Sequence, residues 1–263
     1  MDLQEITPMV LCYNEHENIR RCLTRLTWAK QVVVLDEGST DGSHDICNEF
    51  PNVRIEHLPR GLSLAEKCDL GLKKITTEWV LSLDSDYMVP DIFVKEMESL
   101  HPSESTVGYR VPFKLAFFGR EFPNSLYPPR SILYRPKLAS YTQDGHAHRV
   151  QLNGEVLPLD IPLVHDDRKS IGRWFNSQSR YAQEEAAKLS QASWEGLSLQ
   201  DRFRRMIVVA PILVIGWTFL IKGMAWRGRS GLYYGLMRVC AEVMLSVALL
   251  DRMLRDQIEK NEP

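Results

Sequence analysis

Carboxylate side chains follow two apolar segments of the chain, at the residues where those segments end. Asp84 and Asp86 flank a single serine directly after the apolar residues 79–83, and Asp36 closes the run 31–35. Two carboxylates this close can bind a hard divalent cation, Mg²⁺ or Mn²⁺, and bridge it to the phosphate oxygens of a substrate. A lone Asp-x-Asp triplet is more often a solvated turn. The repeated placement at the ends of apolar segments favours the cation site.

Short apolar segments alternate with amphipathic segments over the first third of the chain, which positions these carboxylates. We expect strands at 7–11, 31–35, 53–57 and 79–83, and helices starting near residues 18, 43 and 63. This alternation predicts a parallel sheet covered by helices on both faces. Ligands of such sheets bind beyond the carboxyl ends of the strands, where Tyr13, Glu15, Asp36, Asp84 and Asp86 would gather.

The order of these motifs resembles the family 2, GT-A-fold glycosyltransferases, which use nucleotide-sugar donors. The matching segments are 12–15 with Ile19, 34–42 and 79–86. The resemblance implies an α/β, Rossmann-like GT-A fold with a mainly parallel sheet flanked by helices, followed by a C-terminal helical region. We expect a catalytic domain over 1–168, with a donor half at 1–100 and an acceptor-side half at 101–168. Residues 169–263 would form a basic, apolar region for membrane association or oligomerisation.

The resemblance also implies roles for individual donor-site residues. Tyr13 and Glu15 would line the nucleoside pocket, and Asp36 would accept a hydrogen bond from the base or ribose. Asp84 would serve both ribose and metal, with Asp86 as the main metal ligand. Lys67 would face the donor diphosphate and offset leaving-group charge; the alternative for Lys67 is a solvated helix lysine.

Transfer with inversion needs a base that takes the proton of the acceptor hydroxyl. Asp144 occupies the corresponding place in the acceptor-side half and is the first candidate, with His146 and His148 as rivals. Many relatives of the lipopolysaccharide-core type carry a His-Glu pair near this point, where this chain has His148-Arg149. The sequence therefore leaves the identity of the base open.

Three further residues have two interpretations each. His165 follows an apolar run, and a histidine at this place in GT-A folds often completes the metal shell; a structural histidine is the alternative. Arg130 and Arg149 could bind a donor or lipid diphosphate, since a guanidinium binds phosphate oxygens in bidentate fashion. Either arginine could equally be a surface ion-pair partner.

Composition excludes several classes of protein. The chain has 263 residues, 32 Lys plus Arg against 34 Asp plus Glu and a net charge of −2, without the basic excess of a nucleic-acid binder. Its 5 cysteines contain no Cys-x-x-Cys pair, which fits neither a disulfide framework nor a zinc ribbon and favours a reducing compartment. The acidic N-terminus lacks the features of a signal peptide, so we expect the catalytic part to stay at the cytoplasmic side.

The C-terminal part has a different surface. Residues 202–229 contain six basic side chains and no acidic one, and they bracket the uncharged run 206–221. That run is shorter than the ~20 residues of a membrane span, and the later apolar stretch 232–250 carries Arg238 and Glu242. We expect these helices to lie at an anionic membrane surface. The alternative is that their apolar faces pack together in a homo-oligomer.

Together these observations predict an inverting, metal-dependent glycosyltransferase of polysaccharide or lipopolysaccharide biosynthesis. It would use a nucleotide-sugar, with UDP favoured, and a lipid-linked saccharide at the cytoplasmic face of a bacterial inner membrane. Arg173-Trp174 lacks the glutamine of the processive Gln-x-x-Arg-Trp motif, which favours single additions. The alternatives are a nucleotidyltransferase, which would also use two aspartates and Mg²⁺, and a non-catalytic scaffold with a degenerate GT-A fold.

Overall fold

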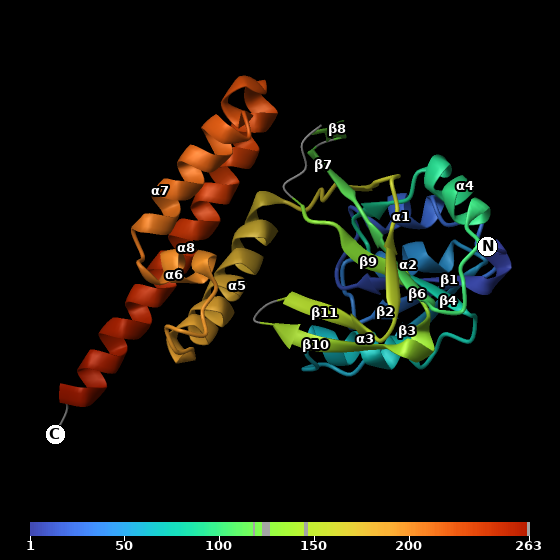
Figure 1. The fold of residues 1–263 in the computed structure, drawn as a ribbon, viewed down its shortest axis with the longest axis horizontal. Helices are drawn as coiled ribbons and strands as arrows, with labels where there is room; N and C mark the ends of the chain where they lie inside the picture. The colour runs from blue at the N-terminus through green and yellow to red at the C-terminus, as the bar shows by residue number, and fades with distance from the viewer. Residues whose placement is uncertain (118, 123–126, 145–146, 262–263) are drawn as a thin grey trace. The chain divides into compact units, whose positions relative to one another are not determined.

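The computed structural model describes residues 1–117, 119–122, 127–144 and 147–261. The chain divides into two compact units, Met1–Lys169 and Ser170–Pro263 (Figure 1). The first unit is a mixed α/β structure, and the second is helical.

A seven-stranded sheet in the order β12-β6-β9-β4-β1-β2-β3 forms the centre of the first unit. Its parallel core pairs β4 with β1, β1 with β2 and β2 with β3, while β9 runs antiparallel to both β4 and β6. The strands are β1 (Ile6–Cys12), β2 (Val32–Asp36), β3 (Val53–His57), β4 (Trp79–Asp84), β6 (Thr106–Val111), β9 (Arg130–Tyr134) and β12 (Glu155–Pro158). The parallel α/β sheet predicted from the first third of the sequence is confirmed.

Two smaller sheets complete this unit. One has the order β5-β13-β7-β8, and the other is a two-stranded antiparallel ribbon of β10 and β11. Their bounds are β5 (Tyr87–Met88), β7 (Phe113–Phe117), β8 (Arg120–Glu121), β10 (Ala139–Asp144), β11 (Ala147–Leu152) and β13 (Leu163–His165). Asn153 and Gly154 read as a hairpin turn in the sequence, but this is wrong: they connect β11 to β12, which pairs with β6 in the central sheet.

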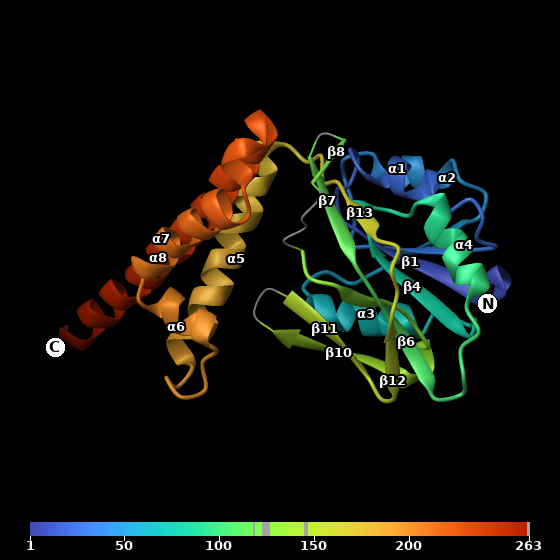
Figure 2. The ribbon, with the colours of Figure 1, turned by 45° about the horizontal axis from the view of Figure 1, so that its top comes forward.

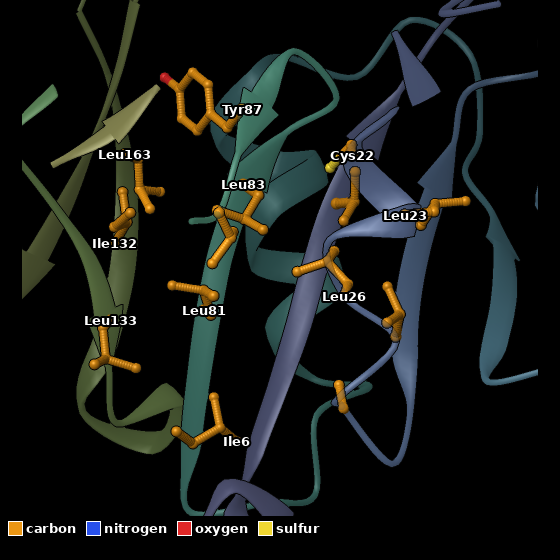
Figure 3. Close-up of a cluster of buried hydrophobic side chains, with 14 of the residues drawn as sticks. Ile6, Cys22, Leu23, Leu26, Leu81, Leu83, Tyr87, Ile132, Leu133 and Leu163 are labelled. Atoms are coloured by element: carbon orange, nitrogen blue, oxygen red, sulfur yellow. The ribbon is translucent and has the colours of Figure 1, made fainter. Parts of the chain in front are cut away.

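Helices cover both faces of the central sheet because its strands are apolar on both sides (Figure 2). Alternate β1 residues point in opposite directions: Ile6 and Val10 pack in one core cluster, and Met9 packs in the other. The first cluster includes side chains of α1 (Ile19–Thr24), α2 (Ser43–Asn48) and α4 (Asp91–Ser99), and part of it is drawn in Figure 3. The second includes α3 (Leu64–Leu72) and the β10–β11 ribbon. The helices packed on both faces keep the ends of the central strands in position.

The second unit contains α5 (Ile171–Gln191), α6 (Leu199–Arg205), α7 (Val209–Ile215), the π-helical segment η3 (Gly216–Ile221), the short η4 (Met224–Trp226) and α8 (Gly228–Asn261). Its small core joins α5 to the middle of α8 through Ala182, Ala186, Leu189, Leu245 and Leu249. The chain bends by 117° between α6 and the α7–η3 segment. Within the described residues α8 is long and apolar enough to cross a membrane, and the bent pair would count as a second such element if taken as one span.

Candidate active site

The predicted carboxylates lie at one edge of the central sheet. In the register of the parallel strands, Leu11 of β1 is opposite Asp84 of β4, and Cys12 is opposite Asp36 of β2. The Asp84-Ser85-Asp86 turn is fixed to β1 by a hydrogen bond from the Ser85 hydroxyl to the Leu11 carbonyl. The sheet therefore places these side chains beside the loop that follows β1.

A short strand pair brings His165 to Asp86. β5 begins directly after Asp86 and pairs antiparallel with β13, with His165 opposite Tyr87. The His165 Nε2 atom lies 3.2 Å from Oδ2 of Asp86. Burial disfavours the charged form of both groups, but the attraction between them lowers the pKa of Asp86 and raises the pKa of His165. In this buried pair each group favours the charged form of the other.

Lys169 adds a cation to this pair. Its Nζ atom lies 2.9 Å from Glu15, 3.6 Å from Asp167 and 3.8 Å from Asp86. Its side chain is 19% exposed, so these interactions are only weakly screened by solvent. Burial raises the pKa of Glu15 to about 7 even though Lys169 opposes the shift. Three carboxylates thus share one ammonium group.

The loops after β1 and β2 are bound to each other by side chains. Asn14 adopts φ 55°, a conformation that asparagine tolerates better than most residues, and its Oδ1 accepts a hydrogen bond from the Thr40 amide at 2.7 Å. The Asn14 amide donates to the Ser39 hydroxyl at 2.9 Å. Tyr13 is 49% exposed at the rim of this loop. Asp36 is buried, and its oxygens accept hydrogen bonds from Gly38 and Ser39. Asp36 therefore shapes its own loop.

Two basic residues lie beside these groups and already have acidic neighbours. Lys67 of α3 forms an ion pair with Glu37 at 2.7 Å. Arg130 of β9 has Nη1 3.9 Å from Oδ2 of Asp84 and 3.2 Å from the Tyr87 hydroxyl, and its guanidinium lies over the Tyr127 ring. The structure thus brings Arg130 to Asp84, while Arg149 lies on β11 in the separate two-stranded ribbon.

Two of the predicted bases, Asp144 and His148, lie on the β10–β11 ribbon. Asp144 is the last residue of β10, and the neighbouring Gln143 accepts a hydrogen bond from the Ala65 amide at the start of α3. His146 lies outside the described residues, and the side chains of Asp144 and His148 are also outside them. The backbone therefore places Asp144 near the start of the helix that carries Lys67.

The carboxylates at the strand ends are candidate ligands of a divalent cation. Among the described residues, no three His, Cys, Asp or Glu side chains are grouped so as to hold a metal ion alone. However, Asp86 Oδ1 is buried and has no hydrogen-bond partner within the described part of the chain, and Asp84 ends the neighbouring strand. A magnesium-type cation needs only one or two carboxylates when substrate phosphates supply other ligands. The residues present fit that kind of site.

A mainly parallel α/β sheet with carboxylates at its strand ends is the architecture expected of a GT-A fold. Residues 9–150 match glycosyl transferase family 2. The chain belongs to this family and is a glycosyltransferase, so the resemblance seen in the sequence is confirmed. The family assignment overrides both alternatives, the nucleotidyltransferase and the non-catalytic scaffold.

Relatives of known name agree with this assignment. The lipopolysaccharide core biosynthesis glycosyltransferase LpsC of Rhizobium meliloti is 26% identical over 244 residues, which cover 86% of this chain and 84% of LpsC. The glycosyltransferase GlyA of Streptococcus pneumoniae is 32% identical over 102 residues, but these span only 14% of GlyA. Among solved structures, the mannosyltransferase PcManGT from Pyrobaculum calidifontis, in complex with GDP-Man and Mn²⁺, superposes with a TM-score of 0.51 at 14% identity, covering 94% of this chain and 87% of that chain. This last likeness establishes the shared fold.

Sequence reasoning missed Lys169, Asp167 and Asn18. Asn18 is fully buried, donates to both Glu15 and Asp167 at 3.0 Å, and accepts from the Arg168 amide. Asp167 and Lys169 follow His165 within four positions, and this run of charged residues after an apolar strand is a local signal in the sequence. Asn18 offered none beyond its place at the start of a helix.

Proposed function

We propose that this glycosyltransferase moves a sugar with inversion from a nucleotide-sugar, with UDP favoured as the nucleotide, to a hydroxyl of a lipid-linked or cell-envelope saccharide, one sugar per encounter. The observation that carries the proposal is the Asp86–His165 pair at the strand ends, with Asp84 beside it and an unpartnered, buried Asp86 oxygen among the described residues.

Asp86, Asp84 and His165 are the residues that would hold Mg²⁺ or Mn²⁺. When bound, the ion would neutralise charge on the diphosphate leaving group. Arg130 supports the same role, because its guanidinium already lies beside Asp84 and can bind phosphate oxygens in bidentate fashion. Lys67 would leave its ion pair with Glu37 and bind a diphosphate oxygen instead. Arg149 would bind a further phosphate oxygen on the acceptor side.

Tyr13 and Glu15 would line the nucleoside pocket. Tyr13 is exposed enough for its ring to stack on a base, whereas Glu15 is tied to Lys169 and would act mainly by keeping the loop after β1 in place. Asp36 would accept a hydrogen bond from the base or ribose only by sharing oxygens that already accept from Ser39 and Gly38.

The acceptor hydroxyl oxygen would attack the anomeric carbon as the bond to the diphosphate breaks. Its proton would pass to Asp144, with His146 as the second candidate. The position of Asp144 at the end of β10, close to the start of α3, supports this assignment.

The helical unit supports an acceptor held at a membrane. It exposes many large apolar side chains, and the relative LpsC is named for lipopolysaccharide core biosynthesis. We place the enzyme at the cytoplasmic face of a bacterial inner membrane.

A thermal-shift panel tests the donor chemistry. UDP, GDP and dTDP are each added with Mn²⁺ to the full chain, and we expect one of them to raise the melting temperature because it binds the native state alone. Asp86→Asn should abolish the shift. Asp91→Asn, which changes an exposed aspartate of α4 in the same unit, should leave it intact. No shift with any nucleotide would refute the donor site.

A further inference from the structure

Helix α8 carries a continuous exposed apolar stripe along most of its length. Its members are three, four or seven residues apart, so at 100° per residue they occupy one side of the helix. Leu236, Val243, Val247, Leu250 and Leu254 are between 43% and 59% exposed. Arg238 lies five residues before Val243 and so falls on the opposite side of the helix.

The α7–η3 segment presents a second exposed apolar surface and packs closely on the first half of α8. Ile212, Leu220 and Ile221 are 62%, 66% and 69% exposed. A Cβ atom at Gly231 would lie 2.3 Å from the Met224 carbonyl oxygen, and one at Gly235 would lie 2.4 Å from the Phe219 ring. Gly235 thus lets η3 lie close to α8 and Gly231 lets the following η4 do so, with the Gly-x-x-x-Gly spacing of helix pairs that pack closely in lipid.

Tryptophans and basic residues gather around the connection between the two segments. Trp226 is 74% exposed, Trp217 is 52% exposed, and the Lys222 ammonium lies 5.4 Å from the centre of the Trp217 indole. Arg227 and Arg229 follow directly in the sequence. Tryptophan beside Lys or Arg is the pairing suited to the headgroup zone of an anionic bilayer.

We propose that the helical unit lies in the plane of an anionic membrane surface, with the α8 stripe and the α7–η3 segment in the zone between headgroups and acyl chains, and that it does not span the bilayer. This deepens the membrane-surface part of the proposed function and is independent of the donor chemistry.

An ion pair argues against a spanning α8. Glu242, in the middle of α8, is 6% exposed and bonded to Arg204 of α6 at 2.9 Å. Arg204 also lies 3.6 Å from Asp201 of the same helix. A spanning α8 would therefore carry part of the polar helix α6 into the hydrocarbon, which is costly for charged groups. Residues 209–221 are also too short for a second span, at about 20 Å against the ~30 Å hydrocarbon core.

The flanks of the stripe argue against a second copy of the chain as its partner. A coiled-coil seam is normally bordered by charged residues that select the partner helix. Over residues 232–247 the stripe of α8 is bordered instead by Leu232 and Val239 on one side and by Met237 and Met244 on the other, and charged residues border it further on, where Asp251 and Arg255 form an exposed ion pair. Such a wide apolar face matches a lipid surface better than a narrow protein seam.

Co-sedimentation of the full chain with lipid vesicles, without nucleotide, tests the surface. We expect binding to vesicles of seven parts phosphatidylcholine to three parts phosphatidylglycerol, and at least tenfold weaker binding to phosphatidylcholine alone. Val247→Asp should weaken binding to the anionic vesicles about tenfold. Ile92→Asp on α4 is the matched control, since Ile92 and Val247 are both 59% exposed, and it should bind like the unmodified chain.

Unchanged vesicle binding by Val247→Asp would overturn the proposal. So would an absence of binding to the anionic vesicles; a dimer, seen by sedimentation velocity, that Val247→Asp converts to monomer would then identify a second copy of the chain as the partner. Because donor binding is measured separately by thermal shift, either failure leaves the donor site unaffected.

The depth of Cys240 in the bilayer distinguishes a helix that lies in the membrane plane from one that spans the membrane. Cys240 borders the stripe and is partly exposed, whereas the other four cysteines are buried, so a fluorescent label would attach to it selectively. In-plane binding predicts stronger quenching by a nitroxide near the lipid headgroup than by one near the acyl-chain end. The reverse order would show a span with Cys240 near the bilayer centre and would overturn the proposal.

Discussion

His165 Nε2 lies 3.2 Å from Oδ2 of Asp86, although the two residues are 79 positions apart in the chain. The antiparallel pairing of β5 with β13 brings the two side chains together, because it places His165 opposite Tyr87, the residue after Asp86. Tyr87 of β5 and Leu163 of β13 belong to the same core cluster (Figure 3). The pair joins the turn after β4 to the last residue of β13.

Removing Lys169 should destabilise the catalytic unit. Lys169→Ala leaves Glu15, Asp86 and Asp167 without their shared ammonium group, and breaking a buried ion pair in this way costs about 3–5 kcal/mol. Urea unfolding measures the loss. Lys169→Arg keeps the charge and should recover most of it, whereas a loss below about 0.5 kcal/mol, the scale of an exposed pair, would show that the ammonium is not holding the carboxylates.

Glu15 should make stability depend on pH. Its pKa of about 7 in the folded chain lies above the ordinary 4.5, so the folded state holds this proton more tightly than the unfolded state does. This group's contribution to the free energy of unfolding is therefore full below pH 4.5 and declines as pH rises through about 7.

The comparison with Glu15→Gln isolates that contribution. Between acidic and mildly alkaline pH, the unfolding free energy of the unmodified chain should fall relative to the variant by up to about 3 kcal/mol. The measurement is urea unfolding across that range. Parallel pH profiles for the two proteins would rule out the raised pKa.

The sequence predicted the elements of the parallel sheet because each strand is a short apolar run followed by a helix with its own start signals. Ser63 and Glu66, for example, form a capping box at the start of α3. The sequence did not predict the cluster around Lys169. That cluster depends on the pairing of β13 with β5 and on hydrogen bonds from Asn18 across 149 positions, and neither leaves a local pattern in the sequence.

Arg130 should contribute to donor binding. Its guanidinium lies 3.9 Å from Asp84, so it can reach a diphosphate held at the strand ends. Arg130→Ala should weaken binding of the nucleoside diphosphate about 10- to 100-fold, the scale of charge-assisted hydrogen bonds. Isothermal titration calorimetry measures the affinity. Arg110→Ala, at an exposed arginine of β6, is the control, and equal affinities for both variants would remove Arg130 from the site.

Arg204 and Glu242 should act as a pair in the helical unit. Arg204→Ala leaves a buried carboxylate and should cost about 3–5 kcal/mol, while the double change Arg204→Met with Glu242→Met should recover much of it. Urea unfolding followed by circular dichroism gives both values. Arg255→Ala breaks an exposed ion pair with Asp251 in α8 and should cost under about 1 kcal/mol. Equal losses from the two arginine variants would contradict a special role for the buried pair.

The most direct test of the active-site assignment is an electron paramagnetic resonance titration of free Mn²⁺ with the full chain and the nucleoside diphosphate that gives the largest thermal shift. We expect the unmodified chain and Asp91→Asn to bind Mn²⁺ with the same affinity, and Asp86→Asn to bind it at least tenfold more weakly. Equal Mn²⁺ affinity in Asp86→Asn, or no Mn²⁺ binding by the unmodified chain, would contradict the assignment.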